Sequence, residues 1–268
     1  MVDTARDFSG SIPEYYDSIL GPAQLNALAA DLVRRIPVRP KGDVLELACG
    51  TGIVTQRLRE RVDSNFRLVA TDLSEAMLAY ARSKVKGKID WRLADAAALP
   101  FKDETFGAVV CALGVMFVPD KQKLFAETRR VLNEGGLLLF NTWDRLERNP
   151  HAKGASDVMQ TLFPGDAEMD FSSIPYGFND ETAIRGLLEG ARFRNVEIDK
   201  VKIQVDCPSA RSFATGQIRG TPRSTLIEKK GAKLDEVIDK VATALAAVGG
   251  AEPFRVEANA LVVRAQAY

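Results

Sequence analysis

The chain is poor in cysteine and histidine. Its three cysteines lie at positions 49, 111 and 207, and none forms a Cys-x-x-Cys pair. Sparse, unpaired cysteines exclude a disulfide scaffold and favour a reducing compartment. His151 is the only histidine. The usual zinc-ligand spacings are therefore missing, and we expect no metal site.

A surplus of charge is also missing. Lysine plus arginine number 36, as do aspartate plus glutamate, so the formal net charge is zero. Nucleic-acid-binding proteins usually carry a basic excess or a basic stripe, whereas here the cations are interleaved with acids along the chain. We therefore expect no nucleic acid among the partners.

Long apolar runs are the third absence. The longest run, residues 106–118, lies between Glu104 and Asp120, and it is shorter than the roughly 20 residues of a membrane-spanning helix. The first residues lack the apolar stretch of a signal peptide. We expect a cytoplasmic protein without a membrane span, and the oligomeric state, monomer or homodimer, stays open.

What the chain does have is an alternation of predicted strands and helices. With 268 residues and 46% hydrophobic composition, it is long enough for one α/β domain with an accessory part. Apolar runs predict strands at residues 44–48, 66–71, 89–94, 108–112, 137–142, 196–205 and 261–265. Helical spacing between most of them is typical of a doubly wound sheet. Further helical patterns run to about residue 35 after Gly21-Pro22, and over 145–179 and 209–249.

This pattern is organised around residues 44–52, Val-Leu-Glu-Leu-Ala-Cys-Gly-Thr-Gly. An apolar strand ends there in a tight turn, and Val54, Leu58 and Val62 then recur on one helical face. Glycine tolerates positive φ and leaves no Cβ in a ligand's way, so the loop predicts backbone close to a nucleotide-like ligand. A dinucleotide site needs a third glycine, where Thr55 stands. A plain strand-to-helix turn is the other alternative.

Two acids follow at the ends of the next two strands. Asp72 lies twenty residues beyond Gly52, where a carboxylate can accept both ribose hydroxyls of a nucleoside. The alternative is that Asp72 only caps the next helix beside Ser74. Asp95, followed by Ala96, ends the third predicted strand.

These motifs, in this order and at this spacing, resemble those of class I S-adenosylmethionine (SAM)-dependent methyltransferases. Glu46-x-Ala48-x-Gly50-x-Gly52 is similar to their acidic-x-Gly-x-Gly-x-Gly loop, with Ala48 in place of the first glycine. The stretch from about 42 to 143 is similar to the small-molecule group that includes the ubiquinone/menaquinone C-methyltransferases. The resemblance implies SAM as cofactor and S-adenosylhomocysteine as product.

The expected fold class is therefore α/β: a doubly wound, Rossmann-like, seven-stranded and mostly parallel sheet with an antiparallel last strand, plus a helical cap. We expect a single methyltransferase domain over residues 1–268. Its core is predicted at about 36–144, 180–206 and 256–268, and its cap from 1–35, 145–179 and 207–255.

The resemblance also implies a set of cofactor contacts. Glu46 is expected to anchor the loop or to reach the methionine amine through water, while Asp72 holds the ribose. Asp95 and the next backbone amide are expected to read the adenine edge. The complete set of predicted cofactor-binding residues is Tyr16, Glu46, Ala48, Gly50, Thr51, Gly52, Asp72, Leu73, Met77, Asp95, Ala96, Ala112 and Leu113.

No catalytic residue carries over from the family. The SAM sulfonium already activates its methyl group, so orientation of the acceptor supplies much of the rate, and a base is needed only if the acceptor must lose a proton. Tyr16 in a lid and His151 as a general base are the candidates. The alternatives are that Tyr16 only pins the N-terminal helix and that His151 is a surface loop residue, and for His151 we favour the alternative.

The predicted acceptor pocket contains Tyr15, Phe117, Asn141 and Trp143, with packing as their alternative role. Further aromatic residues of the predicted cap, such as Phe171, indicate a mostly apolar pocket for a small organic molecule. The expected function is SAM-dependent methyl transfer to such an acceptor, bound under the cap. A methyltransferase acting on a protein or RNA, a non-catalytic SAM-binding protein and a dehydrogenase are the alternatives.

Overall fold

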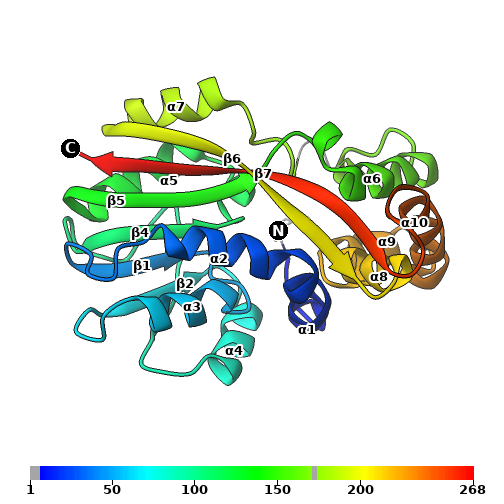
Figure 1. The fold of residues 1–268 in the computed structure, drawn as a ribbon, viewed down its shortest axis with the longest axis horizontal. Helices are drawn as coiled ribbons and strands as arrows, with labels where there is room; N and C mark the ends of the chain where they lie inside the picture. Colours follow the sequence, from blue (N-terminus) through cyan, green and yellow to red (C-terminus); the bar gives the residue numbers. More distant parts are fainter. Residues whose placement is uncertain (1–6, 171–173) are drawn as a thin grey trace. The chain divides into compact units, whose positions relative to one another are not determined.

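The computed structural model describes residues 7–170 and 174–268, so Phe171 of the predicted cap lies outside the described residues. The chain forms two compact units (Figure 1). The helical unit consists of Met1–Ala27, Asp144–Gly177 and Lys202–Asn259, and the sheet unit of Leu28–Trp143, Phe178–Val201 and Ala260–Tyr268. Among the helices in the described ranges, none combines the length and the apolar character that crossing a bilayer requires.

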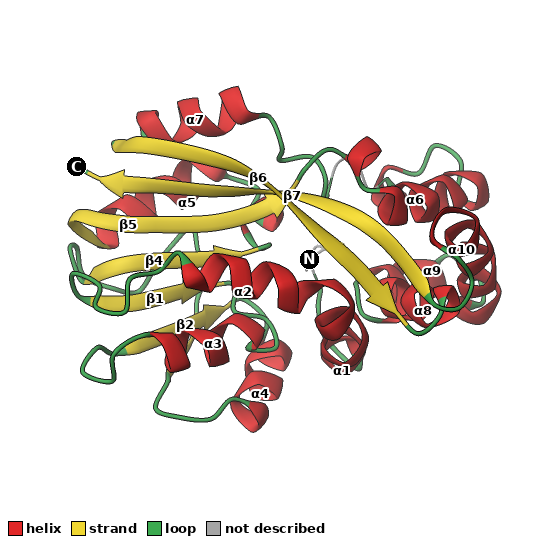
Figure 2. Ribbon diagram, viewed as in Figure 1, coloured by secondary structure: helices red, strands yellow, loops and turns green. Residues whose placement is uncertain are grey.

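The sheet unit is built on one seven-stranded sheet (Figure 2). The strands are β1 (Asp43–Leu47), β2 (Leu68–Asp72), β3 (Asp90–Leu93), β4 (Phe106–Ala112), β5 (Leu132–Trp143), β6 (Phe193–Cys207) and β7 (Phe254–Ala267). Their order is β3-β2-β1-β4-β5-β7-β6. Strands β1 to β5 pair in parallel, and β7 pairs antiparallel to β5. The predicted fold class, with its antiparallel last strand, is confirmed.

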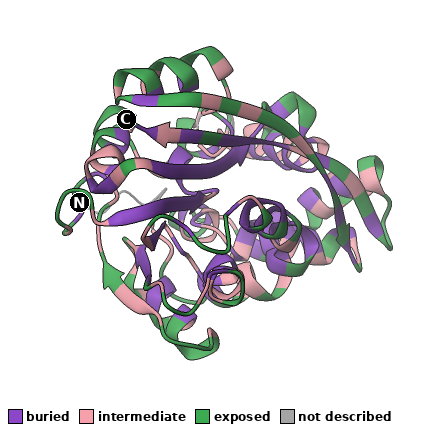
Figure 3. Cartoon of the chain, turned by 60° about the vertical axis from the view of Figure 1, so that its left-hand side comes forward, coloured by how far each residue is buried: buried purple, intermediate pink, exposed green. Residues whose placement is uncertain are grey.

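Both faces of this sheet are buried, because side chains of successive strand residues alternate between two hydrophobic clusters. Leu45 of β1 and Val109 of β4 point to one face, while Val44 and Val110 point to the other. Helices α5 (Lys121–Val131) and α7 (Glu181–Gly190) pack on the first face, and α2 (Asn26–Arg34) and α3 (Ile53–Arg61) on the second. The central strands are accordingly buried along most of their length (Figure 3).

The remaining helix of the sheet unit, α4 (Glu75–Lys84), follows β2. Ser74 begins it as predicted, since its hydroxyl oxygen accepts a hydrogen bond from the Met77 N–H at 3.3 Å. Leu78 of α4 packs with Cys49 and Ala70 in a small separate cluster. The carboxyl ends of β1 and β2 therefore have a packed helix behind them.

Apart from isolated 3-10 turns, the described part of the helical unit contains six helical segments. They are α1 (Ile12–Tyr15), η2 (Tyr16–Leu25), α6 (Pro150–Leu162), α8 (Ala210–Arg219), α9 (Arg223–Lys229) and α10 (Leu234–Gly249). Helix α8 packs against α10 and η2, and α10 also packs against α6. At the centre of the unit the rings of Phe213 and Phe254 stack at 5.1 Å.

Three details of the sequence prediction are wrong. The N-terminal helix does not start after Gly21-Pro22 but continues through them as η2, a π-type helix in which the Asn26 N–H donates to the Gly21 carbonyl. The wider turn tolerates Pro22, which lacks an N–H. Residues 209–249 form three helices, interrupted near Gly220 and Gly231. Strands β5, β6 and β7 extend beyond the predicted 137–142, 196–205 and 261–265.

The predicted cap also included residues 28–35, which belong to the sheet unit. The reason is the apolar face of α2, because Ala29, Leu32 and Val33 pack into the sheet's second cluster. The wider assignment of a catalytic core and a cap within one domain stays a prediction.

Candidate functional site

The loop after β1 reverses direction through three left-handed residues. Ala48 has φ 50°, Gly50 φ 53° and Gly52 φ 82°, a region that side chains disfavour and glycine tolerates. A Cβ on Gly52 would lie 2.4 Å from Cγ2 of Val85, so this glycine lets the start of α3 approach the end of α4. A Cβ on Gly50 would meet nothing within 4 Å. Gly50 therefore presents bare backbone to open space.

Ala48, which stands where the family pattern has a glycine, has room for its methyl group because Gly114 has no side chain. A Cβ on Gly114 would lie 2.5 Å from the Ala48 Cβ and 2.8 Å from the Cys111 Sγ. The methyl group of Ala48 thus occupies space that Gly114, after β4, leaves vacant. Sequence reasoning missed this role of Gly114, because the two residues meet only when β1 and β4 are neighbours.

Asp72 joins the loops that follow β1 and β2. Its Oδ2 accepts a hydrogen bond from the Gly50 N–H at 2.8 Å, and its Oδ1 accepts one from the Ser74 N–H at 2.8 Å. Burial raises the pKa of Asp72 above its ordinary value, against these backbone donors, which lower it. A carboxylate offers about four lone-pair sites, so its two oxygens keep capacity for further donors.

Glu46 lies fully buried in the strand that leads into the loop. Burial raises its pKa from 4.5 to about 8; the Thr55 hydroxyl lowers it and the charge of Asp72 raises it further. Its Oε2 has no hydrogen-bond partner within the described ranges, and the same holds for the buried hydroxyl of Thr51. Buried polar atoms of this kind are rare in folded proteins and call for a specific explanation.

The ends of β4 and β5 are joined in a similar way. Leu113 has φ 50°, and its N–H donates at 2.8 Å to Oδ1 of Asn141, which is completely buried. Nδ2 of Asn141 has no partner among the described residues. Asn141 therefore holds the turn after Ala112 and still offers one buried donor.

The other predicted sheet-unit residues differ in exposure. Oδ1 of Asp95 accepts the Ala97 N–H at 2.8 Å in a tight turn that leaves Asp95 exposed. Leu73 is 68% exposed, an unusual value for a leucine beside a strand end, whereas Met77 is buried. Ala96 and Phe117 are half-buried, and Trp143 is buried at the end of β5.

Three predicted residues belong to the helical unit. Tyr15 and Tyr16 are half-buried there: the Arg219 guanidinium lies 6.0 Å from the Tyr15 ring, and the Tyr16 ring packs edge-on to Phe8. The favoured prediction of His151 as a surface loop residue is wrong. It lies in the first turn of α6 with no exposed surface, because the Pro-rich stretch around it starts a helix instead of forming a loop.

The His151 imidazole is a poor proton acceptor in this setting. Burial lowers its pKa from 6.5 to about 3, and its Nε2 lies 3.4 Å from the Tyr176 hydroxyl oxygen. Efficient general bases have pKa values near the working pH. The ring is edge-on to Phe213 at 5.8 Å, which accounts for its burial by packing.

Hydrogen bonds and close contacts thus bring together the loops after β2, β1 and β4 and the end of β5, and these four strands are neighbours in the sheet. In doubly wound sheets, ligands bind beyond the carboxyl ends of the strands. Bare backbone at Gly50, two acids and the unpartnered polar atoms of Glu46, Thr51 and Asn141 fit a nucleoside that carries an amino-acid tail. The SAM molecule has that composition.

Comparison with known proteins agrees with this geometry. Residues 44–136 match the profile of a family described as "Methyltransferase domain". The chain is 30% identical over 174 residues to the ubiquinone/menaquinone biosynthesis C-methyltransferase UbiE of Klebsiella pneumoniae, which covers 60% of this chain and 69% of the relative. It is 37% identical over 170 residues to the UbiE of Teredinibacter turnerae, covering 58% and 68%. The chain belongs to the class I SAM-dependent methyltransferases.

Solved structures of methyltransferases share the fold. The phosphoethanolamine N-methyltransferase 2 of Haemonchus contortus, in complex with SAM, matches with a TM-score of 0.62 at 16% identity, over 99% of this chain and 60% of that one. A methyltransferase from Bacillus halodurans matches with a TM-score of 0.58 at 20% identity, over 90% and 98%.

Membership of the family makes the chain an enzyme of the methyltransferase class, with SAM as its methyl donor. The dehydrogenase alternative, which rested on the Gly-rich turn alone, is thereby excluded. The resemblance identified in the sequence is confirmed.

Proposed function

We propose that this methyltransferase transfers the SAM methyl group to a small organic acceptor. The observation that carries the proposal is the set of joined strand-end loops around Gly50, where three buried residues keep unpartnered polar atoms. The names of the UbiE relatives, which refer to quinone biosynthesis, support an acceptor of small size. The balanced charge of the chain supports the same class over an RNA.

In this proposal the loop residues hold the cofactor. Asp72 accepts the ribose hydroxyls, the backbone from Ala48 to Gly52 faces the methionine part, and Asp95 reads the adenine edge. Glu46 and Asn141 contribute the buried acceptor and donor that the structure leaves unpartnered. SAM supplies an activated methyl group, so these residues act by orientation, which contributes roughly 7–11 kcal/mol in favourable cases.

The helical unit supplies the acceptor specificity in this proposal. Its His151 is too weak a base to remove a proton near neutral pH. This favours an acceptor that is already nucleophilic, or one whose proton leaves to solvent, over an acceptor that depends on an imidazole. Tyr15, Phe117 and Trp143 remain candidates for contact with the acceptor, and Tyr16 remains a candidate for a lid.

The cofactor assignment is tested by calorimetric titration with S-adenosylhomocysteine. We expect Asp72→Asn to weaken binding at least about tenfold, because a charge-assisted hydrogen bond contributes roughly 1.5–3 kcal/mol. Asp90→Asn is the matched control, since Asp90 lies on β3 in an ion pair with Arg92 outside the proposed site. Equal affinities of the two variants would contradict the ribose assignment.

The acceptor class is tested with methyl-labelled SAM. Panels of quinols, phenols and small amines are offered beside total RNA and a protein extract, and the labelled product is separated by size. Label in a small-molecule fraction supports the proposal, whereas label in RNA or protein alone would overturn it.

A further inference from the structure

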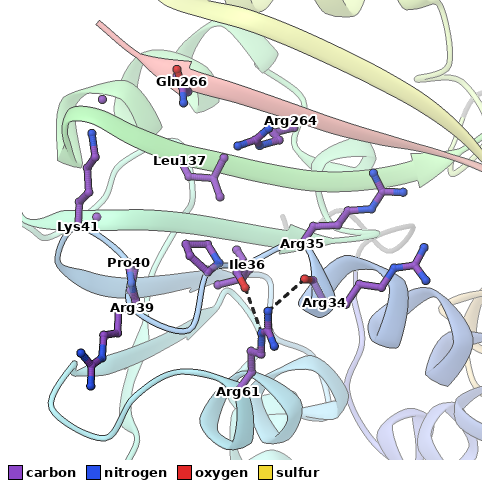
Figure 4. Close-up of a pocket in the computed structure, with 13 residues that line it drawn as sticks. Arg34, Arg35, Ile36, Arg39, Pro40, Lys41, Arg61, Leu137, Arg264 and Gln266 are labelled. Atoms are coloured by element: carbon purple, nitrogen blue, oxygen red, sulfur yellow. Dashed lines mark hydrogen bonds between the residues drawn. The ribbon is translucent and has the colours of Figure 1, made fainter.

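A cavity lies at the opposite end of the strands from the proposed SAM loop, where β1, β4 and β5 begin. It has a volume of about 410 Å³ and is lined entirely by sheet-unit residues (Figure 4). They are Arg34, Arg35, Ile36, Pro37, Arg39, Pro40, Lys41, Arg61, Gly107, Gly135, Leu137, Arg264 and Gln266. We call it the basic cavity. The proposed SAM loop follows the carboxyl ends of the strands, so the two sites are separate.

The lining of the basic cavity is strongly one-sided in charge. Six of its residues are cationic and none is acidic. Carboxylates from outside the lining offset part of this charge: Asp31 pairs with Arg34 and Arg35, Asp199 with Arg35, Asp63 with Arg39 and Glu197 with Arg264. Six cations against four carboxylates leave a local surplus of two positive charges, in a chain whose net charge is zero.

That surplus can be assigned to two residues. Lys41 has no hydrogen bond or ion pair through its Nζ in the part of the chain that the structure describes, and this atom lies beside Gly135 of β5. Among the described residues Arg61 donates only to backbone carbonyls at the end of α2, those of Ile36 at 3.1 Å and Arg34 at 3.4 Å (Figure 4). No carboxylate of the described ranges neutralises either cation, so both favour an anion nearby.

Apolar residues also line the basic cavity. Pro37 is exposed among the cations, whereas Ile36, Pro40 and Leu137 are buried. Figure 4 shows Lys41, Arg264 and Gln266 around one space above Pro40, whereas Arg39 points away from it. The volume lies within the roughly 300–1,000 Å³ of small-molecule sites, and a local hollow of this size, open to solvent, differs from the extended basic stripe of a nucleic-acid binder.

We propose that the basic cavity binds a phosphorylated organic small molecule that carries at least two negative charges. Lys41, which has no carboxylate partner among the described residues, and Arg264, whose ion pair with Glu197 is solvent-exposed, contact the phosphates, and the exposed Pro37 contacts the organic part. Arginine and lysine are the common partners of phosphate groups. This site does not depend on the acceptor, and its ligand is not the SAM molecule, which carries no phosphate.

The test is calorimetric titration with inorganic pyrophosphate and, separately, uridine triphosphate, both without magnesium. Saturating S-adenosylhomocysteine is present throughout, so that a nucleotide cannot enter the cofactor site. We expect saturable binding of at least one probe, no binding of uridine, and a loss of affinity of at least about tenfold in the variant Lys41→Gln/Arg264→Gln.

The matched control is Lys102→Gln/Lys200→Gln. It also removes one lysine that has no ion pair among the described residues, Lys102, and one ion-paired surface cation, Lys200, whose partner is Glu181. Both residues lie in the sheet unit outside the cavity. Unchanged affinity in the control supports the proposal, as does retained S-adenosylhomocysteine binding in the cavity variant. Equal losses in both variants, binding of neither probe at millimolar concentration, or binding only of a 20-nucleotide RNA offered as a third probe would each overturn it.

Discussion

The buried Glu46 predicts that cofactor binding releases a proton. With a pKa of about 8, roughly nine-tenths of the Glu46 side chains are protonated at pH 7 in the absence of cofactor. The methionine ammonium and the sulfonium of SAM are positive, and an approaching positive charge favours the ionised carboxylate. We therefore expect close to one proton to be released per bound SAM at pH 7, and the affinity to rise up to about tenfold per pH unit below pH 8.

The assay is titration calorimetry at pH 7 in phosphate and in Tris, whose ionisation enthalpies differ. The difference between the two apparent binding enthalpies counts the protons exchanged. Glu46→Gln should bind SAM more weakly and exchange almost no protons. Because burial raises the pKa of Asp72 as well, the variant is needed to assign the proton to Glu46. Proton release of the same size in both proteins would refute the assignment.

The same group predicts how stability depends on pH. The folded protein without cofactor keeps its Glu46 proton up to about pH 8, whereas the unfolded chain loses it near pH 4.5. Between these values the folded state binds more protons, so the free energy of unfolding falls as the pH rises. The full fall is on the order of 5 kcal/mol at about 1.4 kcal/mol per pKa unit. Glu46→Gln should remove this slope in denaturant unfolding at pH 5 to 8.

Two further predictions concern packing and the buried histidine. Gly114→Ala should lose about 1–3 kcal/mol of unfolding free energy through overpacking. Adding Ala48→Gly should restore part of this free energy, since one of the two close contacts disappears. Equal unfolding midpoints for the single and double variants would contradict the contact. His151 has its pKa lowered to about 3, so its contribution has the opposite sign to that of Glu46: stability should fall as the pH drops from 6.5 towards 3. His151→Gln should flatten this low-pH loss of stability without changing the shape of the pH–turnover profile. If the variant instead lost the fall in turnover at low pH that protonation of a general base causes, His151 would have a role in catalysis.

The sequence was sufficient for the sheet and for the loop at its centre. Alternating apolar runs predicted the seven strands, and the glycines at 50 and 52 predicted the left-handed turn, because both signals depend on local chemistry. Contacts between strands distant in sequence could not be predicted. Ala48 packs against Gly114, and Asn141 accepts a hydrogen bond from Leu113, only because β4 lies between β1 and β5 in the folded sheet.

Burial was the other limit of the sequence. A lone histidine in a Pro-rich stretch gave no sign that Pro150 starts a helix and that Phe213 closes over the ring. The basic cavity was missed as well. Four of its six cations lie within residues 34–41, a stretch without an acid, but Arg61 and Arg264 are distant in sequence, and only the fold brings them beside that stretch.

The path of the chain between the two units has a consequence for how such an enzyme can change. The chain passes from one unit to the other five times, and two of these passages, at 201–202 and 259–260, lie inside β6 and β7. No single cut separates the units, so a recombination event that exchanges one unit would have to replace three segments at once. Strand backbone also resists sharp bending more than a loop does. New substrates are therefore more accessible to this lineage by point substitution than by exchange of whole modules.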